Sequence, residues 1–306
     1  MPTLPARTLT PFPPGDGLAI GDGTITIDQW LANPLRVTQA LRDLSLERFL
    51  ADRIFAPGGR ATGGAVIFDQ ILGNELYTLR DVQAIEPGSE FPIVTGEAVN
   101  PLMARTTKWG GAFIVTYEDR DRHRTDVLAQ QLTQLTNTIV RKVDTVAIAT
   151  LRAAPLLTAV ASAPWADPDA NIFSDVASAI SMVDSQDLGY SVDTALISPR
   201  TALNMLTNER LQSLLPRESP NNVALVGRLG GFAGITNWAQ SNRVGDDEVI
   251  FVAGRQVGSI SDERPLYSRV VDQPEQERYL VQAARLTVPY VTNPKSAVIM
   301  RGVGTA

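Results

Sequence analysis

The sequence predicts a mixed chain of the α+β class, and three patterns carry this prediction. Residues 56–118 are a series of short β-rich runs separated by glycines. A single long stretch of helical periodicity begins at Thr125. Beyond Pro155, helix-like and strand-like segments alternate, and the chain closes on two strands. The three patterns follow one another along the chain and together place it in the α+β class.

The composition excludes several classes of function. The chain has no cysteine and a single histidine, His123, which rules out thiol nucleophiles, thiolate metal sites and sites built on two imidazoles. The 27 basic and 33 acidic residues give a net charge of -6, so no overall positive field would hold a nucleic-acid backbone. We expect no catalytic, cofactor or metal site, and an exposed or ion-paired His123 between Arg122 and Arg124.

The first part of the chain reads as an arm followed by helix. Residues 1–26 are rich in proline and glycine and predict an extended arm. Apolar residues then recur at steps of three and four between Ile27 and Phe55, which predicts one or two short amphipathic helices. The uncharged run 153–166 is too short and too proline-rich to cross a bilayer, and we expect a protein that does not enter the membrane.

The β-rich segment 56–118 contains few large apolar residues for its length. Its strand-like runs are residues 65–68, 91–95 and 112–117. In the last run, Phe113 and Val115 alternate with Ile114 and Thr116, as in a strand with one better-buried face. Because ordering a chain costs entropy that burial must offset, we expect this segment to bury itself against a neighbouring subunit.

The most regular pattern in the sequence is one long amphipathic helix. It starts near Thr125 or Asp126, either of which can cap it, and Pro155 bounds its end. At 1.5 Å per residue it would be roughly 40–45 Å long. Its apolar positions are Leu128, Leu132, Leu135, Ile139, Val143, Val146 and Leu151.

The remaining segments predict an alternation of helix and strand. Helices are expected at residues 172–183 and 201–206, the second opening near Pro199. Strands are expected at residues 194–198, 249–252, 278–289 and 296–303, with a glycine-rich turn at 227–234.

Two acidic patterns invite a functional interpretation. Asp167, Asp169 and Asn171 begin like a calcium loop, with Asp175 at its ninth position. The glycine and the final glutamate of such a loop are missing, so we expect a loop with a helix cap. The carboxylates at 246–248 and 262–263 could serve a glycosidase, but their polar surroundings predict solvated turns.

The order of these parts resembles the tailed-bacteriophage major capsid proteins of the Hong Kong 97-type fold. The resemblance covers nearly the whole chain. The segments that carry it are Phe91 to Ala98, Lys108 to Glu118, Ile197 to Arg200, Gly230 to Ile235 and Arg285 to Met300.

The resemblance implies a division of the chain into parts. Residues 1–55 would be the N-terminal arm and helix, and residues 56–118 an extended loop lying over the adjacent subunit. A peripheral domain with a long spine helix would comprise residues 119–156 and 263–290. An axial domain would comprise residues 157–262 and 291–306.

The resemblance also implies a function. Copies of the chain would assemble into pentamers and hexamers of an icosahedral shell that encloses phage double-stranded DNA without sequence-specific binding. We expect assembly in the cytoplasm of a host bacterium, a separate scaffolding protein, a portal and in some cases decoration proteins. Candidate intersubunit contacts are Glu90, Glu97, Lys108, Arg120 and Arg122.

Alternatives stay open at this point. An encapsulin-like nanocompartment shell would use the same fold to hold a protein cargo, and an α+β hydrolase would need a site that the sequence does not reveal. Some members of the family cross-link themselves through a lysine, an asparagine and a catalytic glutamate. The corresponding positions here are Ala283 for the glutamate and the vicinity of Gln276 for the asparagine, which predicts a non-covalent shell.

Overall fold

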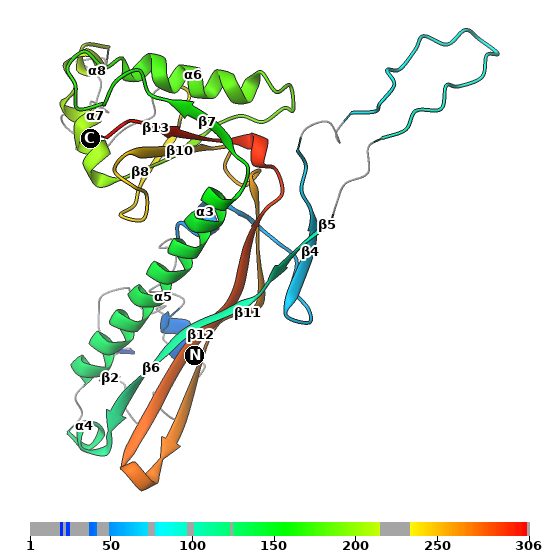
Figure 1. The fold of residues 1–306 in the computed structure, drawn as a ribbon. Helices are drawn as coiled ribbons and strands as arrows, with labels where there is room; N and C mark the ends of the chain where they lie inside the picture. Colours follow the sequence, from blue (N-terminus) through cyan, green and yellow to red (C-terminus); the bar gives the residue numbers. More distant parts are fainter. Residues whose placement is uncertain are drawn as a thin grey trace, which may run out of the picture. The chain divides into compact units, whose positions relative to one another are not determined.

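The computed structural model describes residues 19–20, 23–24, 37–41, 49–72, 77–96, 101–122, 125–214 and 233–304 (Figure 1). The chain divides into two compact units. The larger unit comprises Leu50–Thr106, Asp144–Ser261 and Val288–Ala306, and the smaller comprises Met1–Phe49, Thr107–Val143 and Asp262–Thr287. Helix α5 (Thr125–Ala153) and strands β11 (Gly258–Gln273) and β12 (Arg278–Val291) contribute residues to both units.

A five-stranded sheet forms the centre of the larger unit, in the order β7, β13, β10, β8, β9. The strands are β7 (Leu157–Val160), β8 (Thr194–Ile197), β9 (Asn237–Gln240), β10 (Glu248–Val252) and β13 (Ala297–Arg301). Strand β10 is antiparallel to both of its neighbours, with Ile250 opposite Leu196 and Ile299. The outer strand β7 pairs in parallel with β13, and the outer strand β9 pairs in parallel with β8. The three inner strands are buried along almost their whole length, as expected when both faces of a sheet are covered.

The core of the larger unit contains Trp165, Phe251, Val298 and Met300, which belong to one cluster of buried side chains. Helix α6 (Ile172–Asp184) contacts β7 and β13 and adds its apolar side to this cluster. A buried carboxylate, Asp175, accepts hydrogen bonds from the indole Nε1 of Trp165 and the backbone N–H of Ser162, both at 3.1 Å. These bonds satisfy polar groups that would otherwise destabilise the core.

Two helices of the larger unit, α6 and α7, begin where the sequence predicts them. The side chain of Asn171 accepts a hydrogen bond from the N–H of Ser174 at 3.2 Å and so caps α6. Ser198 caps α7 (Pro199–Thr207) by accepting from the N–H of Thr201 at 3.1 Å. Two short helices, α3 (Ala51–Ile54) and α8 (Glu209–Leu214), complete the unit. The pattern at 167–171 is therefore a capped loop, as expected.

In the smaller unit, β6 (Thr107–Thr116) pairs antiparallel with β12, which in turn lies next to β11. Two glycines allow this packing. A Cβ atom on Gly110 would lie 2.5 Å from the carbonyl oxygen of Ala283 on β12. A Cβ atom on Gly111 would lie 2.8 Å from Cδ1 of Leu135 on α5, so helix and strand meet at a residue without a side chain.

Helix α5 confirms the long helix predicted from the sequence and is 29 residues long. Its residues Leu128, Leu132, Ile139, Val143 and Leu151 are buried, as the periodicity requires. Ahead of it, the short helix α4 (Tyr117–Asp121) follows β6 and is capped by the hydroxyl of Thr116. Tyr117 thus begins a helix, whereas the sequence placed it at the end of the predicted strand. The alternation in β6 is confirmed, because Val115 is buried whereas Ile114 is exposed.

One predicted strand is wrong and one strand was missed. Residues 91–95 contain no strand, and only an isolated bridge joins Thr78 to Gly96. Strand β11 was not predicted, and Asp262 and Glu263 lie within it rather than in a turn. The error has a physical reason: Asp262 is half-buried because it pairs with the guanidinium of Arg285, at 3.0 Å from Nε and 3.1 Å from Nη2. Asp246 and Asp247 do lie in a turn, while Glu248 begins β10.

Other short elements complete the description. Strand β3 (Ala56–Pro57) pairs in parallel with β11, and β1 (Ala19–Ile20) pairs antiparallel with β2 (Gly23–Thr24). The 3-10 turns η2 (Pro274–Gln276) and η3 (Pro294–Ser296) follow β11 and β12. Most of the predicted arm, His123 and most of the glycine-rich turn at 227–234 lie outside the described residues.

Candidate assembly surfaces

The extended loop grows out of a two-stranded hairpin in the larger unit. Strand β4 (Ala65–Asp69) pairs antiparallel with β5 (Pro101–Arg105), and Ile67 lies opposite Met103. The ring of Phe68 packs at 4.7 Å from the ring of Tyr290 on β12, which fixes one face of the hairpin. The N–H of Ile71 donates to the carbonyl of Thr292 at 2.8 Å and anchors the start of the loop.

Beyond this anchor the loop has little structure of its own. Figure 1 shows residues 77–96, in cyan, as a long excursion without helix or extended ladder. Its two sides are joined where the N–H of Leu79 donates to the carbonyl of Thr95 at 2.9 Å. The Tyr77 hydroxyl also donates to the carbonyl of Asp187. A segment held by so few bonds gains little stability from its own contacts.

The loop nevertheless carries most of the exposed large apolar side chains among the described residues. Phe91 is 78% exposed and Ile93 is 85% exposed. Both lie in the segment 91–95, in which every residue except Thr95 is apolar. The others in the hairpin and loop are Ile67, Leu72, Tyr77, Leu79, Val82, Ile85, Val94, Leu102 and Met103. Apolar side chains gathered in this way on a surface mark a site of interaction.

A cluster of polar and aromatic side chains lies where β6 ends and α4 begins. The guanidinium of Arg120 packs over the rings of Tyr117 and Tyr279, at 4.9 Å and 5.8 Å from their centroids. It also donates to Asp121 at 3.0 Å and to the hydroxyl of Tyr279 at 2.9 Å. These bonds occupy one face of Arg120 inside its own subunit.

The same cluster perturbs a tyrosine. The hydroxyl of Tyr117 donates to Oδ1 of Asp272 at 2.7 Å. This hydrogen bond to a carboxylate, followed by desolvation, raises the pKa of Tyr117 to about 12. Tyr117 therefore stays a neutral donor at any physiological pH, and the cluster ties α4 to the end of β11.

Four of the five predicted contact residues belong to the part of the chain that the structure describes. Glu90 is exposed in the extended loop of the larger unit, and Glu97 lies outside the described residues. Lys108 is exposed on β6, with Nζ 5.9 Å from the ring centroid of Tyr267. Arg120 is in the tyrosine cluster, and Arg122 is exposed at the C-cap of α4. Of the four described residues, one is in the larger unit and three are in the smaller.

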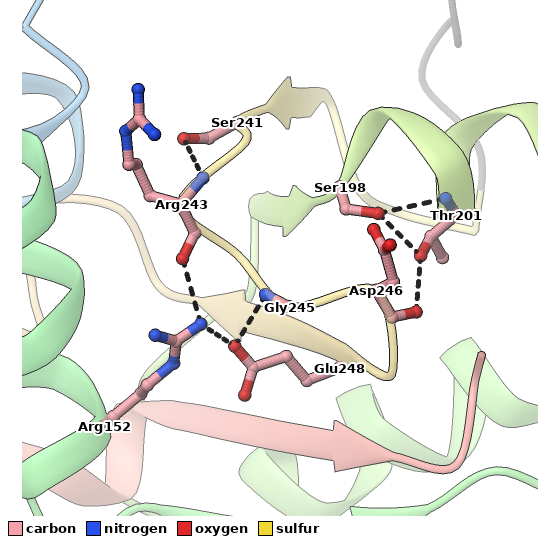
Figure 2. Close-up of polar contacts among 8 residues, drawn as sticks. All are labelled: Arg152, Ser198, Thr201, Ser241, Arg243, Gly245, Asp246 and Glu248. Atoms are coloured by element: carbon pink, nitrogen blue, oxygen red, sulfur yellow. Dashed lines mark hydrogen bonds and ion pairs between the residues drawn. The ribbon is translucent and has the colours of Figure 1, made fainter. Parts of the chain in front are cut away.

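A network of ion pairs and hydrogen bonds orders the turn before β10 (Figure 2). Arg152 at the end of α5 pairs with Glu248 and donates to the carbonyl of Arg243 at 3.0 Å. Glu248 in turn accepts from the N–H of Gly245 at 3.0 Å. On the other side, the Thr201 hydroxyl donates to the carbonyl of Asp246 at 3.0 Å. These polar groups are hydrogen-bond and ion-pair partners of one another, so the network holds the turn in place.

The sequence did not reveal that Asp262 is half-buried and that Asp144 is buried. Asp262 is explained by its pairing with Arg285 on β12. Asp144 lies on the buried side of α5 between Val143 and Ala147, and an aspartate at a core-facing helical position was the pattern that could have revealed it. Burial raises the pKa of Asp144 to about 6, although hydrogen bonds from the backbone N–H groups of Ala51 and Leu50 oppose this rise.

Two other kinds of site are absent from the part of the chain that the structure describes. There, no three side chains of His, Cys, Asp or Glu are grouped so that they could hold a metal ion. No described helix is long and apolar enough to cross a membrane.

Comparison with solved structures identifies the fold. A phage-related protein from Bordetella bronchiseptica RB50 superimposes with a TM-score of 0.62 at 11% identity, covering 90% of this chain and 98% of that one. The virus-like particle from Pyrococcus furiosus gives 0.61 at 14% identity, covering 87% and 98%. The capsid of cyanophage P-SCSP1u gives 0.58 at 15%, covering 82% and 88%. No curated protein sequence matches significantly.

These likenesses define the Hong Kong 97-type fold, to which the long helix and the extended loop belong. A family model described as phage capsid protein matches residues 99–300, which is more than half of the chain. The chain belongs to the phage capsid protein family. It is a structural protein, and family membership sets the hydrolase alternative aside.

Proposed function

We propose that copies of this chain form the pentamers and hexamers of an icosahedral phage head and that the shell encloses double-stranded DNA. The observation that carries the proposal is the exposed apolar surface of the extended loop. Transferring one large apolar side chain from water into a contact is worth roughly 1.5–3 kcal/mol. Side chains such as Phe91 and Ile93 gain this only against another molecule, and in a shell that molecule is a second copy of the chain.

The parts of the chain take specific roles in this proposal. Residues 56–118 lie over the adjacent subunit. The peripheral domain, 119–156 and 263–290, contains the spine helix α5, and the axial domain, 157–262 and 291–306, surrounds the five-fold and six-fold axes. Glu90, Glu97, Lys108, Arg120 and Arg122 contribute ion pairs between subunits. The net charge of -6 suits a wall that must not adhere to its genome.

The proposed assembly pathway uses other proteins. A separate scaffolding protein and a portal take part in the cytoplasm of a bacterial host, and decoration proteins can bind the finished head. The shell is non-covalent, because Ala283 is an apolar residue buried in β12 opposite Gly111 and offers no carboxylate to catalyse a cross-link. A ladder of cross-linked species from purified shells on a denaturing gel would contradict this.

The first experiment is negative-stain electron microscopy of the purified full-length chain, with light scattering for the mass of the particles. We expect five- or six-membered rings, sheets or closed shells. A chain that remains a monomer or dimer should assemble when co-expressed with its neighbouring phage genes. Failure to assemble under both conditions would contradict the proposal.

A second candidate shares the fold. Because one of the similar structures is a virus-like particle from Pyrococcus furiosus, a nanocompartment that encloses protein cargo is the alternative. The two are distinguished by the contents of native particles. Nuclease-protected double-stranded DNA supports the phage head, whereas a co-purifying protein bound to the inner wall without DNA supports the compartment.

A further inference from the structure

Asp144 is a buried carboxylate that the role of the chain as a shell subunit does not explain. It is 9% exposed, and its neighbours on α5, Val143, Ala147 and Ile148, are buried. A charged group at this depth destabilises a fold unless hydrogen bonds compensate for the lost water. The bonds that Asp144 makes are therefore informative.

Asp144 completes the start of another helix. Its Oδ1 accepts the N–H of Ala51 at 3.0 Å, and the N–H of Leu50 also donates to the carboxylate. These are the first N–H groups of α3, whose own N-cap residue, Leu50, provides no side-chain hydrogen bond. Because the first N–H groups of a helix have no partner inside it, Asp144 supplies the acceptor that α3 lacks.

The contact lies where two segments of the chain enter the larger unit. Leu50 and Asp144 are the first residues of that unit in their respective segments. Immediately after Leu50, Ile54 and Phe55 are completely buried, and the carbonyl of Ile54 accepts from the N–H of Arg255 at 2.8 Å. The bonds to Asp144 thus lie at the start of a buried segment of the larger unit.

Charged groups on two other elements face Asp144. Asp52 on α3 repels its ionised form, and Arg243, in the turn before β10, attracts it. Burial is the largest influence and raises the pKa of Asp144 from 3.8 to about 6. The carboxyl group is therefore protonated over a range of pH in which an exposed aspartate is ionised.

We propose that Asp144 is a protonation-sensitive clasp, which holds residues 50–55 against α5 more tightly when its carboxyl group is neutral than when it is ionised. The neutral group still offers an oxygen to the N–H groups of α3 and places no charge in the core. The ionised group keeps these bonds but is buried beside Asp52. This regulation acts within one subunit, so it does not depend on the proposed pentamers and hexamers.

The direction of the effect follows from the raised pKa. The closed clasp binds a proton more tightly than the open, hydrated one, so closure is most favourable below the ordinary aspartate pKa of 3.8. The advantage is lost as the pH rises from there to about 6 and is absent above it. Between pH 5.5 and 7.5, the equilibrium constant for opening the contact between Asp144 and residues 50–55 should increase about fourfold.

The test is hydrogen–deuterium exchange of the full-length chain at pH 5.5 and 7.5, corrected for intrinsic exchange and read from peptides covering residues 49–57. We expect the fourfold increase in opening at pH 7.5 for the wild-type chain. D144N should open equally at both values. D184N removes an exposed carboxylate from the end of α6 and should retain the fourfold difference.

Two further variants test the clasp while leaving Asp144 in place. D52N removes the repulsion and should move the midpoint of the pH dependence downwards, whereas the midpoint for R243Q should move upwards. A wild-type chain whose residues 50–55 open equally at both pH values would overturn the proposal. A pH dependence that persists in D144N, or midpoints that neither D52N nor R243Q displaces, would also overturn it.

Discussion

The five-stranded sheet and residues 65–105 of the extended loop belong to the same compact unit, yet apolar side chains are buried in the sheet and exposed in the loop. Phe251 on β10 is completely buried, whereas Phe91 in the loop is 78% exposed. The sheet is also joined by regular ladders on both sides of β10, whereas a single isolated bridge spans the described part of the loop beyond β4 and β5.

The difference shows that side-chain type alone does not determine what an apolar residue stabilises. In the sheet, burial stabilises the subunit, because the covering side chains come from the same chain. In the loop, the same chemistry leaves the subunit no more stable and becomes available only when another molecule covers it. Mutations in the two regions should therefore affect different measurements.

The largest effect on the subunit should come from W165A. This change leaves a large cavity in the core of the larger unit and removes a hydrogen-bond donor from the buried Asp175. We expect the free energy of unfolding to fall by about 3–5 kcal/mol. Denaturant unfolding followed by circular dichroism measures it. L203A truncates an exposed residue on α7 and is the control, with an expected change of less than about 0.5 kcal/mol.

A smaller effect is expected from G110A in the smaller unit. The new methyl group would lie 2.5 Å from the carbonyl oxygen of Ala283, so β6 and β12 must separate. The expected destabilisation is about 1–3 kcal/mol. G59A is the matched control, since a Cβ atom there meets nothing within 4 Å. Equal unfolding midpoints for the two variants would show that the strands do not pack as closely as described.

The network of Figure 2 should matter less than either. R152Q removes the pair with Glu248 and weakens the bond to the carbonyl of Arg243. Because the Arg152 side chain is partly exposed, we expect a loss of about 0.2–1 kcal/mol. R200Q removes a longer and more exposed pair with Asp246 and should cost less. An R200Q variant less stable than R152Q would contradict this ranking.

The sequence predicted the elements whose pattern is local. Helix α5 was recognisable because its seven apolar positions recur at helical spacing, and α7 because Pro199 marks its start. Strand β11 was missed because Asp262, Glu263 and Arg264 interrupt its pattern, and the partner that explains Asp262, Arg285, lies 23 residues away. The run 91–95 has the composition of a strand but no partner ladder, and pairing is not encoded locally.

The assembly surface was predicted only in outline. A glycine-punctuated segment with too little core of its own indicated the extended loop, and the exposed side chains of Phe91 and Ile93 agree with it. Individual contact residues could not be derived, because ion pairs between subunits depend on surfaces that one chain does not display. The role of Asp144 likewise depends on α3, which is 93 residues distant in sequence.

The smallest effect on the subunit should come from the loop itself. Replacing Phe91 and Ile93 together by serine removes apolar surface that touches little in the subunit. The free energy of unfolding of the unassembled chain should change by less than about 0.5 kcal/mol. Q83S, an exposed polar position in the same loop, is the control. A large destabilisation by the double variant would mean that the subunit already buries these residues.

The measurement that tests the central claim most directly is the assembly of this F91S/I93S variant, compared with the wild-type chain and Q83S by light scattering and negative-stain electron microscopy. We predict that the variant remains unassembled, with an unchanged circular dichroism spectrum, at concentrations at which the other two form particles. Particles formed by the variant with the yield and size of the wild-type would show that the loop's apolar surface does not join the subunits.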